Sequence, residues 1–311
     1  MGRLRTWRIG VLATSAVLWA GWPASMRAHD SPEHEIAALT TRILDSPSAE
    51  LFARRATEWR ALGELEKARG DLETAIALEG QAASLHMELA RIEAAREHYI
   101  AASNAITRGL GLSRDDTERA AVYMARAEIL ESQGLAELAL ADCERAFAES
   151  TPAIDWYLTR ARLQSRCGKM RQFVEGLRDG FEKTGSVVLE IEWIEAMIDA
   201  GEGQQALQRI EPHLERARWK GAWLIRKARA QLALKQRSAA FENLRAALAD
   251  IEYRMKPDRV DLALLTAHGL AQALLENRDA ARADQERIEC LNENSTQLST
   301  SITRLKLALE K

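Results

Sequence analysis

Aromatic residues, prolines and cysteines are scarce in this sequence of 311 residues. Phe, Trp and Tyr together make up 5% of it, there are six prolines, and valine and threonine never form clusters. Because β-strands draw mainly on aromatic and β-branched residues, this composition excludes an extensive sheet. Ala, Leu, Glu and Arg dominate instead. All four lose little side-chain entropy in a helix, so we expect an all-α protein.

The three cysteines, Cys143, Cys167 and Cys290, stand far apart. An odd number without paired spacing gives neither a disulfide framework nor a zinc site. Cys143 falls on an apolar helical face, where we expect it in the core. A bridge between Cys143 and Cys167 stays open, because an oxidising compartment would permit it and the sequence does not fix their distance.

Motifs for phosphate loops, dinucleotide binding, zinc proteases and serine hydrolases are absent from the sequence. The six histidines are scattered. The acidic residues lie along polar helix faces and not in apolar settings that would raise their pKa. No segment remains that could form a separate catalytic domain. We therefore expect no enzyme activity and no cofactor.

The charge balance argues against nucleic acid as a partner. The net charge is −3, and the first 28 residues contribute four arginines and no acid. The rest of the chain carries 39 basic and 46 acidic groups, a net charge of −7. Phosphate binding needs a basic surface, and no Lys/Arg cluster supplies one locally.

The N-terminus has the pattern of an export signal. Residues 1–8 hold three arginines, residues 9–22 are apolar apart from Thr14 and Ser15, and Pro23 ends the run. A helix that spans a bilayer needs about 20 residues, so this run is short for that purpose. Small residues before and at Ala28 favour cleavage there, which predicts an exported protein, periplasmic or secreted. The alternative is an uncleaved segment that anchors the protein to a membrane.

An internal repeat runs through the middle of the chain. Gly134, Gly168, Gly201 and Lys235 follow one another at 34, 33 and 34 residues. Each is followed five residues later by an apolar residue, and three sets of positions recur around them: Ala127, Ala161, Ile194 and Ala228 seven before, Cys143, Leu177, Ile210 and Leu244 nine after, and Ala146, Gly180, His213 and Ala247 twelve after. Two antiparallel helices approach closely where side chains are small, and glycine between them permits a left-handed turn. Such pairs bury their apolar stripes by stacking.

These offsets resemble the tetratricopeptide-repeat family, here of an exported bacterial type. The same pattern is present in residues 50–80, at Ala56, Trp59, Gly63, Ala68, Leu72, Ala75 and Leu78. The resemblance implies a right-handed α-solenoid, a superhelix of stacked antiparallel helix pairs. Three residues depart from the family pattern. His213 replaces the usual alanine, Pro212 predicts a kink or an early end of its helix, and Lys235 in place of glycine predicts a more regular turn.

The resemblance, together with the residue patterns at the two ends, predicts a division of the chain. Residues 1–28 are a signal peptide, 29–48 a flexible N-terminal lead-in, 49–292 the solenoid and 293–311 a C-terminal amphipathic helix. The expected units of the solenoid are about 49–82, 83–119 (degenerate), 120–153, 154–186, 187–220, 221–254 and 258–292 (divergent). Within the degenerate unit, Arg108 to Asp116 predicts a protruding loop, in which Ser113 or Asp115 caps the next helix.

The C-terminal segment carries one apolar stripe. Leu298, Ile302, Leu305 and Leu309 recur at helical spacing. We expect this helix to cap the exposed end of the solenoid. The alternative is a helix that pairs two copies in a weak dimer or binds a partner.

In the tetratricopeptide-repeat family the first helix of each pair lines the concave face. The residues at those positions are Met124, Glu128, Leu158, Arg162, Arg166, Ile191, Glu195, Ile225 and Arg229. They mix apolar, acidic and basic groups, which predicts a scaffold or adaptor that holds an extended or helical peptide of a protein partner. The Lys/Asn clamp with which some members grip a terminal carboxylate is missing at the corresponding positions.

A second hypothesis rests on the segment after the predicted cleavage site. The new terminal amine and the imidazole of His29 could together hold copper or zinc, with Glu33 or His34 nearby. The chain would then be an exported metal-binding or enzyme-accessory protein.

Overall fold

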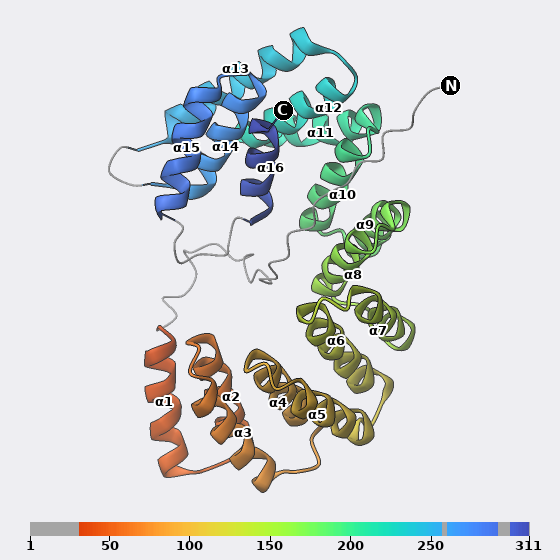
Figure 1. Ribbon diagram of the computed structural model, residues 1–311, viewed down its shortest axis with the longest axis vertical. Helices are drawn as coiled ribbons and strands as arrows, with labels where there is room; N and C mark the ends of the chain where they lie inside the picture. Colours follow the sequence, from red (N-terminus) through yellow and green to blue (C-terminus); the bar gives the residue numbers. More distant parts are fainter. Residues whose placement is uncertain (1–30, 257–259, 292–298, 311) are drawn as a thin grey trace. The chain divides into compact units, whose positions relative to one another are not determined.

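The computed structural model describes residues 31–256, 260–291 and 299–310. Every regular element in these ranges is an α-helix (Figure 1). The chain divides into two compact units, one that ends at Gly176 and one that continues from Leu177 to the C-terminus. The division falls inside one helix, α9.

From residue 31 onward, the first unit contains eight helices and the start of a ninth. They are α1 (Pro32–Asp45), α2 (Ala49–Ala61), α3 (Leu65–Leu78), α4 (Ala83–Ala95), α5 (Tyr99–Leu112), α6 (Asp116–Ser132), α7 (Ala136–Glu149), α8 (Ile154–Arg166) and α9 (Met170–Thr184).

The second unit contains the rest of α9 and seven further helices. They are α10 (Val187–Asp199), α11 (Gly203–Arg216), α12 (Gly221–Ala233), α13 (Arg237–Arg254), α14 (Leu262–Leu274), α15 (Arg278–Leu291) and α16 (Ser299–Leu309).

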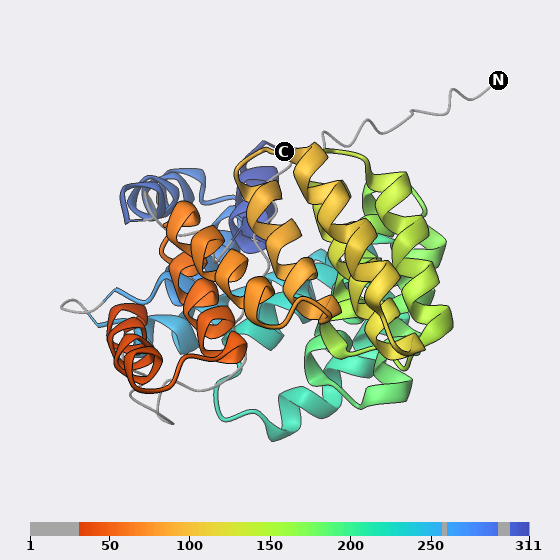
Figure 2. The same ribbon diagram turned by 90° about the horizontal axis from the view of Figure 1, so that it is seen from below.

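Consecutive helices pack as antiparallel pairs, and the pairs stack on one another. In the first unit α2 packs on α3, α4 on α5, and α6 on α7, while α3 contacts α4 and α7 contacts α8 (Figures 1 and 2). In the second unit α12 packs on α13 and α14 on α15, with α11 against α12 and α13 against α14. Each unit is thus a stack of helix pairs, as expected for an α-solenoid.

A residue with left-handed backbone conformation separates the two helices of every pair. These residues are Gly63, Glu97, Gly134, Gly168, Gly201, Lys235 and Glu276, and their φ angles lie between 61° and 82°. At each of them two backbone N–H groups donate back into the preceding helix, as from Gly134 to Glu131 and from Leu135 to Leu130. This is the Schellman arrangement, which satisfies two carbonyls at the end of a helix.

Lys235 therefore does not make a more regular turn, and that prediction was wrong. Its φ of 61° lies in the same left-handed region as that of the glycines. Glu97 and Glu276 occupy the equivalent place in the pairs α4–α5 and α14–α15, which the sequence pattern described as degenerate and divergent. The hydrogen bonds of the turn are backbone bonds, so they form with any residue that tolerates the conformation.

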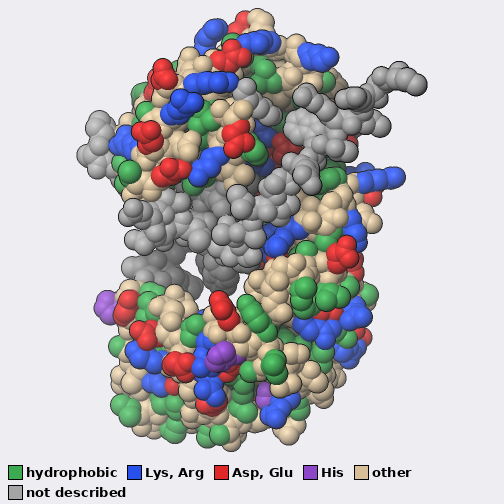
Figure 3. All heavy atoms as spheres, viewed as in Figure 1, with side chains coloured by type: hydrophobic (Ala, Val, Ile, Leu, Met, Phe, Trp, Pro, Cys, Tyr) green, Lys and Arg blue, Asp and Glu red, His purple; other side chains and the backbone are tan. Residues whose placement is uncertain are grey.

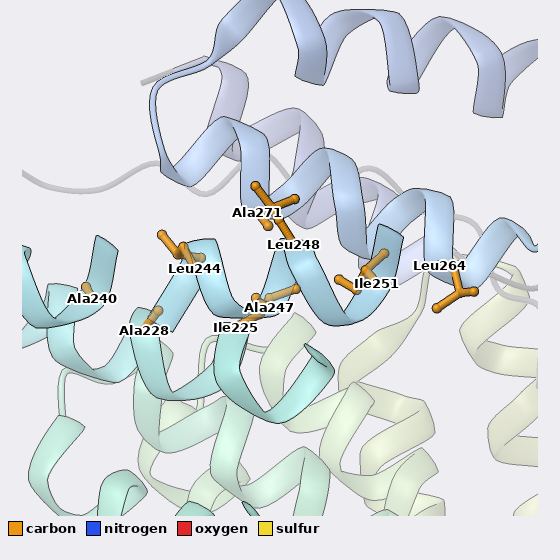
Figure 4. Packing of buried hydrophobic residues seen from close by; sticks show 9 residues of the cluster. All are labelled: Ile225, Ala228, Ala240, Leu244, Ala247, Leu248, Ile251, Leu264 and Ala271. Atoms are coloured by element: carbon orange, nitrogen blue, oxygen red, sulfur yellow. The ribbon is translucent and has the colours of Figure 1, made fainter. Parts of the chain in front are cut away.

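Alanine allows the paired helices to approach closely. Five residues after the left-handed position, six of the seven pairs carry an alanine with 0% exposure: Ala68, Ala102, Ala139, Ala206, Ala240 and Ala281. Figure 4 shows Ala240 of α13 near Ala228 of the preceding helix α12, and Ala247 of α13 near Ile225 of α12, with Leu244 in the same cluster. The residues predicted seven before and nine after the turn are all buried, from Ala127 to Leu244.

Two segments predicted to be irregular are helical. The lead-in forms α1 from Pro32 onward, and Ile36 and Leu39 are buried on the side that packs against α2. Arg108 to Leu112 form the last turn of α5, so the prediction of a protruding loop was wrong. Gly109 is buried in this turn, and a Cβ there would meet the carbonyl oxygen of Ala83 at 3.4 Å and Val122 at 3.5 Å, which are ordinary van der Waals distances.

Two local predictions on helix ends had different outcomes. Asp115 caps α6, since its carboxylate accepts a hydrogen bond from the Glu118 N–H at 2.8 Å, whereas the Ser113 hydroxyl donates back to Gly109 in α5. Helix α11 continues through Pro212 to Arg216, so the prediction that it ends early was wrong. A proline removes one helical hydrogen bond, and buried Ile210 and Leu214 hold the helix on either side of it.

Cys143 and Cys167 are free thiols in this structure. Both belong to the apolar cluster around α6, α7 and α8, and burial raises the pKa of the Cys143 thiol to about 12. Cys143 is therefore a core residue, as predicted, and it is protonated at neutral pH.

Residues 1–30, with the predicted export signal and His29, lie outside the described residues. Among the helices that the structure describes, none has both the length and the apolar character needed to cross a membrane.

Replacing Lys235 by glycine should stabilise the second unit. Glycine adopts the left-handed conformation without the Cβ clash, and we expect the free energy of unfolding in urea to rise by about 1 kcal/mol. Lys235→Ala is the matched control, because it removes the side chain and keeps the strained conformation. Equal stability of the glycine and alanine variants would contradict this explanation.

Candidate functional site

The candidate site is the surface made by the first helix of each pair, which we call the first-helix face. In the first unit it is made by α2, α4, α6 and α8, and in the second by α10, α12 and α14. In the space-filling view, acidic and basic side chains are intermingled over the visible surface of each unit (Figure 3). The charged groups of the first-helix face are largely paired with one another.

In the first unit, ion pairs join each first helix to the next. The Nη2 atom of Arg60 lies 3.9 Å from Glu88, and the Nε atom of Arg91 lies 3.1 Å from Glu128. Glu131 makes the strongest set. It accepts two hydrogen bonds of 2.8 Å from Arg162 and a third of 3.1 Å from Arg166.

In the second unit, Glu195 has the equivalent role. It accepts a hydrogen bond of 2.9 Å from Arg226 and another from Arg229, which also donates to Asp199 at 2.7 Å. Burial disfavours the ionised form of Glu195, but Arg229, Arg304 and Arg226 outweigh this and hold its pKa below the usual range. Burial raises the pKa of neighbouring Glu192.

A second set of pairs joins the two helices within a pair, at a separation of 16 residues. Arg55 bonds Asp71 through two atoms at 2.7 and 2.6 Å, and Arg126 bonds Asp142 in the same way at 2.5 and 2.7 Å. In the last pair the corresponding residues are His268 and Asp284, whose Nδ1 and Oδ2 atoms are 2.6 Å apart.

The structure divides the nine predicted partner-binding residues into two groups. Met124 and Ile225 are buried in apolar clusters, and the buried carboxylate of Glu195 is occupied by arginines. These three have little side-chain surface for a partner. The other six, Glu128, Leu158, Arg162, Arg166, Ile191 and Arg229, are partly exposed.

The sequence analysis missed the pairing of these charges. The partners on successive first helices stand 28 to 37 residues apart, as in Arg60 with Glu88 and Arg91 with Glu128. A search for opposite charges at about one repeat length would have found them. Reversing the charge of Arg162 and Arg166 would place two acids beside Glu131 and disturb the fold. Such a variant is therefore unsuitable for testing whether these arginines bind a partner.

His213, which replaces an alanine of the family pattern, has a structural contact of its own. Its ring is stacked on that of Trp223, with centroids 4.2 Å apart and planes 4° from parallel. Its Nε2 atom lies 3.0 Å from Glu190. The larger side chain is therefore accommodated between α10 and α12.

The metal-site hypothesis remains untested at its main residue, because His29 lies outside the described residues. His34 is in the first turn of α1. Among the residues that the structure describes, no group of three or more His, Cys, Asp or Glu side chains is placed to hold a metal ion.

Neutralising the buried carboxylate of α6 should weaken the first unit. Glu131→Gln keeps the shape of the side chain but leaves Arg162 and Arg166 without their counter-charge, and we expect a loss of about 1–3 kcal/mol in the free energy of unfolding. Glu128→Gln is the matched control on the same helix. Its pair with Arg91 is more exposed, so its loss should be below about 1 kcal/mol. Equal losses would show that burial of the pair does not matter.

The His268 contact predicts a pH-dependent stability. The hydrogen bond to Asp284 raises the pKa of His268 above its ordinary 6.5, and Glu252 adds to this. A raised folded pKa means that the stabilisation is complete below about pH 6.5 and is lost as the pH rises through the folded pKa. The difference in unfolding free energy between wild type and His268→Gln should therefore shrink from pH 5.5 to pH 9. A difference that does not change with pH would contradict the assignment.

Comparison with known proteins identifies the type of fold. No protein-family model matches the sequence, and no curated protein matches it. A tetratricopeptide-repeat protein from Parabacteroides merdae is similar in structure, with 15% sequence identity and a TM-score of 0.55 over 83% of this chain and 98% of that one.

Two further structures have lower scores. A chain of the Cut9–Hcn1 hetero-tetramer of APC/C is 14% identical, with a TM-score of 0.48 over 87% of this chain and 52% of that one. YrrB, a tetratricopeptide-repeat protein with an unusual peptide-binding site, is 15% identical, with a TM-score of 0.32 over 69% and 93%. At such identities the likeness concerns the fold, and the assignment rests on the Parabacteroides protein together with the seven turns and stacked pairs described above. The chain therefore has the helical-repeat fold of the tetratricopeptide-repeat proteins.

Proposed function

We propose that this chain is a non-catalytic scaffold that binds a peptide or protein partner on its first-helix face. One feature of the first unit carries the proposal: a partly exposed leucine lies beside an arginine whose orientation is fixed. Leu158 and Arg162 stand four residues apart on α8, so they share one side of the helix. An apolar contact next to an oriented hydrogen-bond donor is typical of grooves that hold peptides.

The guanidinium of Arg162 is held in one orientation and still has donors for a partner. Arg162 uses its Nε and Nη2 atoms in the two bonds to Glu131, and its side chain is 34% exposed. The Nη1 atom carries two further N–H donors. Because Glu131 already holds the guanidinium in place, a partner that accepts from Nη1 loses little affinity to ordering the side chain.

These groups indicate the chemistry of the partner. The contact at Leu158 suits an apolar residue of a peptide, and Arg162 suits a carboxylate or a backbone carbonyl oxygen. Most other charges of the face are neutralised within the chain, as in the pair of Arg91 with Glu128. A polyanion would find no continuous basic surface there, which agrees with the net charge of −7 beyond residue 28.

We also propose that the protein acts after export. This rests on the arginine-rich start, the apolar run and the small residues up to Ala28. The partner would then be another exported protein or the exposed part of a membrane protein.

The proposal is tested by selecting peptides from a random phage-displayed library on the wild-type chain and measuring their affinity for two variants. Leu158→Arg removes the apolar contact of the first-helix face. Burial of a leucine is worth about 1.5–3 kcal/mol, so Kd should rise about 10- to 100-fold.

The matched control is Leu138→Arg, the same change at a side chain that is 57% exposed on the second helix α7. It should leave Kd unchanged. An unchanged Kd for the Leu158 variant, or an equal loss for the Leu138 variant, would refute binding at the first-helix face. Thermal unfolding confirms that both variants are folded.

A further inference from the structure

The C-terminal helix α16 packs on the first-helix face of the second unit. It contacts α14 and α15, and Figure 1 shows it beside α14. Leu305 is fully buried in an apolar cluster with Leu265, Ala281 and Ile288. A Cβ on Gly269 of α14 would lie 3.1 Å from the Cδ2 atom of Leu305, so the glycine makes room for the leucine.

Arg304, which precedes this leucine, contacts a helix two pairs away in the same unit. The Nη2 atom of Arg304 lies 3.5 Å from the Oε2 atom of Glu195 on α10. In a stack of helix pairs each pair contacts its neighbours, so a helix that only closed the end would contact α14 and α15 alone. Helix α16 itself packs on α14 and α15, and the Arg304 side chain reaches from it across the first-helix face to α10.

The charges of this surface are balanced only with α16 in place. Glu192, Glu195 and Asp199 of α10 lie beside two arginines of α12, Arg226 and Arg229. Without Arg304 this group has three acids and two bases. The counterpart in the first unit, Glu131 with Arg162 and Arg166, has no such excess of acid.

The rest of α16 is less buried, although Ile302, Ala308 and Leu309 also pack against the cluster. Lys306 pairs with Glu289 at 3.0 Å through side chains that are about half exposed, and Leu307 is 53% exposed. The helix has 11 residues, which is too short to be stable by itself in water. Leu305 is therefore the most deeply buried residue of this attachment, and Arg304 adds the ion pair to α10.

We propose that the first-helix face of the second unit is a binding groove for a short amphipathic helix with adjacent arginine and leucine, and that α16 occupies it until such a helix from a partner protein displaces it. The leucine enters the cluster beside Gly269, and the arginine neutralises the excess acid at Glu195. This inference extends the proposed function by naming a partner for the second unit. The Leu158 test concerns the first unit, so the two can fail separately.

The test uses the full chain and a fluorescein-labelled synthetic peptide of residues 299–311, measured by fluorescence anisotropy. In the wild type the tethered α16 competes at an effective concentration in the millimolar range, so the peptide should bind weakly. Leu305→Glu in the chain releases α16 and leaves the groove intact, and the peptide should bind at least about 10-fold more tightly. A peptide that itself carries Leu305→Glu should bind neither chain.

Leu307→Glu is the matched control, the same substitution two residues away on the exposed side of α16. It should bind the peptide as weakly as the wild type does. Arg304→Gln is a milder second variant, which removes the charge and spares the apolar cluster, and it should show an intermediate gain.

Three results would overturn the proposal. The first is no gain in peptide binding for the Leu305→Glu and Arg304→Gln chains while hydrogen exchange shows α14 and α15 still protected. The second is loss of that protection in both variants, which would make α16 an indispensable part of the fold. The third is a wild-type dimer in sedimentation that becomes a monomer in the Leu305→Glu chain, which would make a second copy the occupant.

Discussion

The close approach of alanine-faced helices is the contact on which the rest of this structure depends. Alanine fills the gap between the two helices of most pairs, and wherever it does so five residues after the turn it is fully buried. A larger side chain at these places would push the helices apart and open the turn that joins them. The left-handed residue and its two backbone hydrogen bonds then bring the chain back at a fixed distance. Local geometry of this kind recurs in six of the seven pairs, whereas the pair α8–α9 carries Phe173 at the alanine position.

Alanine contacts alone would leave the stacking of the pairs loosely defined. They are small, smooth and nearly equivalent from one turn to the next, so a pair could shift along its neighbour at little cost. Buried carboxylates that bind arginines of the next pair remove that freedom, as Glu131 does with Arg162 and Glu195 does with Arg226. Ion pairs of this kind add little net stability but strongly disfavour misalignment, because a shift would leave a buried charge without its partner. We infer that their main contribution is to the register of the stack.

The same groups give the first-helix face its functional character. An arginine held by a buried acid presents its remaining donors in a fixed direction, and the neighbouring leucine offers apolar surface. In the second unit α16 uses this combination from the other side, with Arg304 directed to Glu195 and Leu305 seated at Gly269. The groups that fix the register of the stack are therefore also the groups that a partner helix or peptide would meet.

The amino-acid sequence by itself determined the helices, their pairing and the repeat, because helix propensity, small residues and turn glycines act over a few residues. It gave the buried offsets around Gly134 and the cap at Asp115 correctly. Two residues show where its predictions failed. Gly109 was expected in a loop, but it lies in helix α5 in contact with Ala83 and Val122. Lys235 was expected to give a more regular turn, but the turn is left-handed and has the same backbone hydrogen bonds as the others.

Only the tertiary structure decided which charges are free and which are paired. Glu131 and Arg162 are more than 30 residues apart, and Glu195 and Arg304 more than 100, so their contact depends on how the pairs stack and where α16 lies. Met124 and Ile225 were assigned to the binding surface by their repeat position, but both are buried. A small rotation of a helix about its axis decides whether such a side chain faces solvent or the neighbouring pair. That angle is set by packing between helices, which no single segment of the sequence contains.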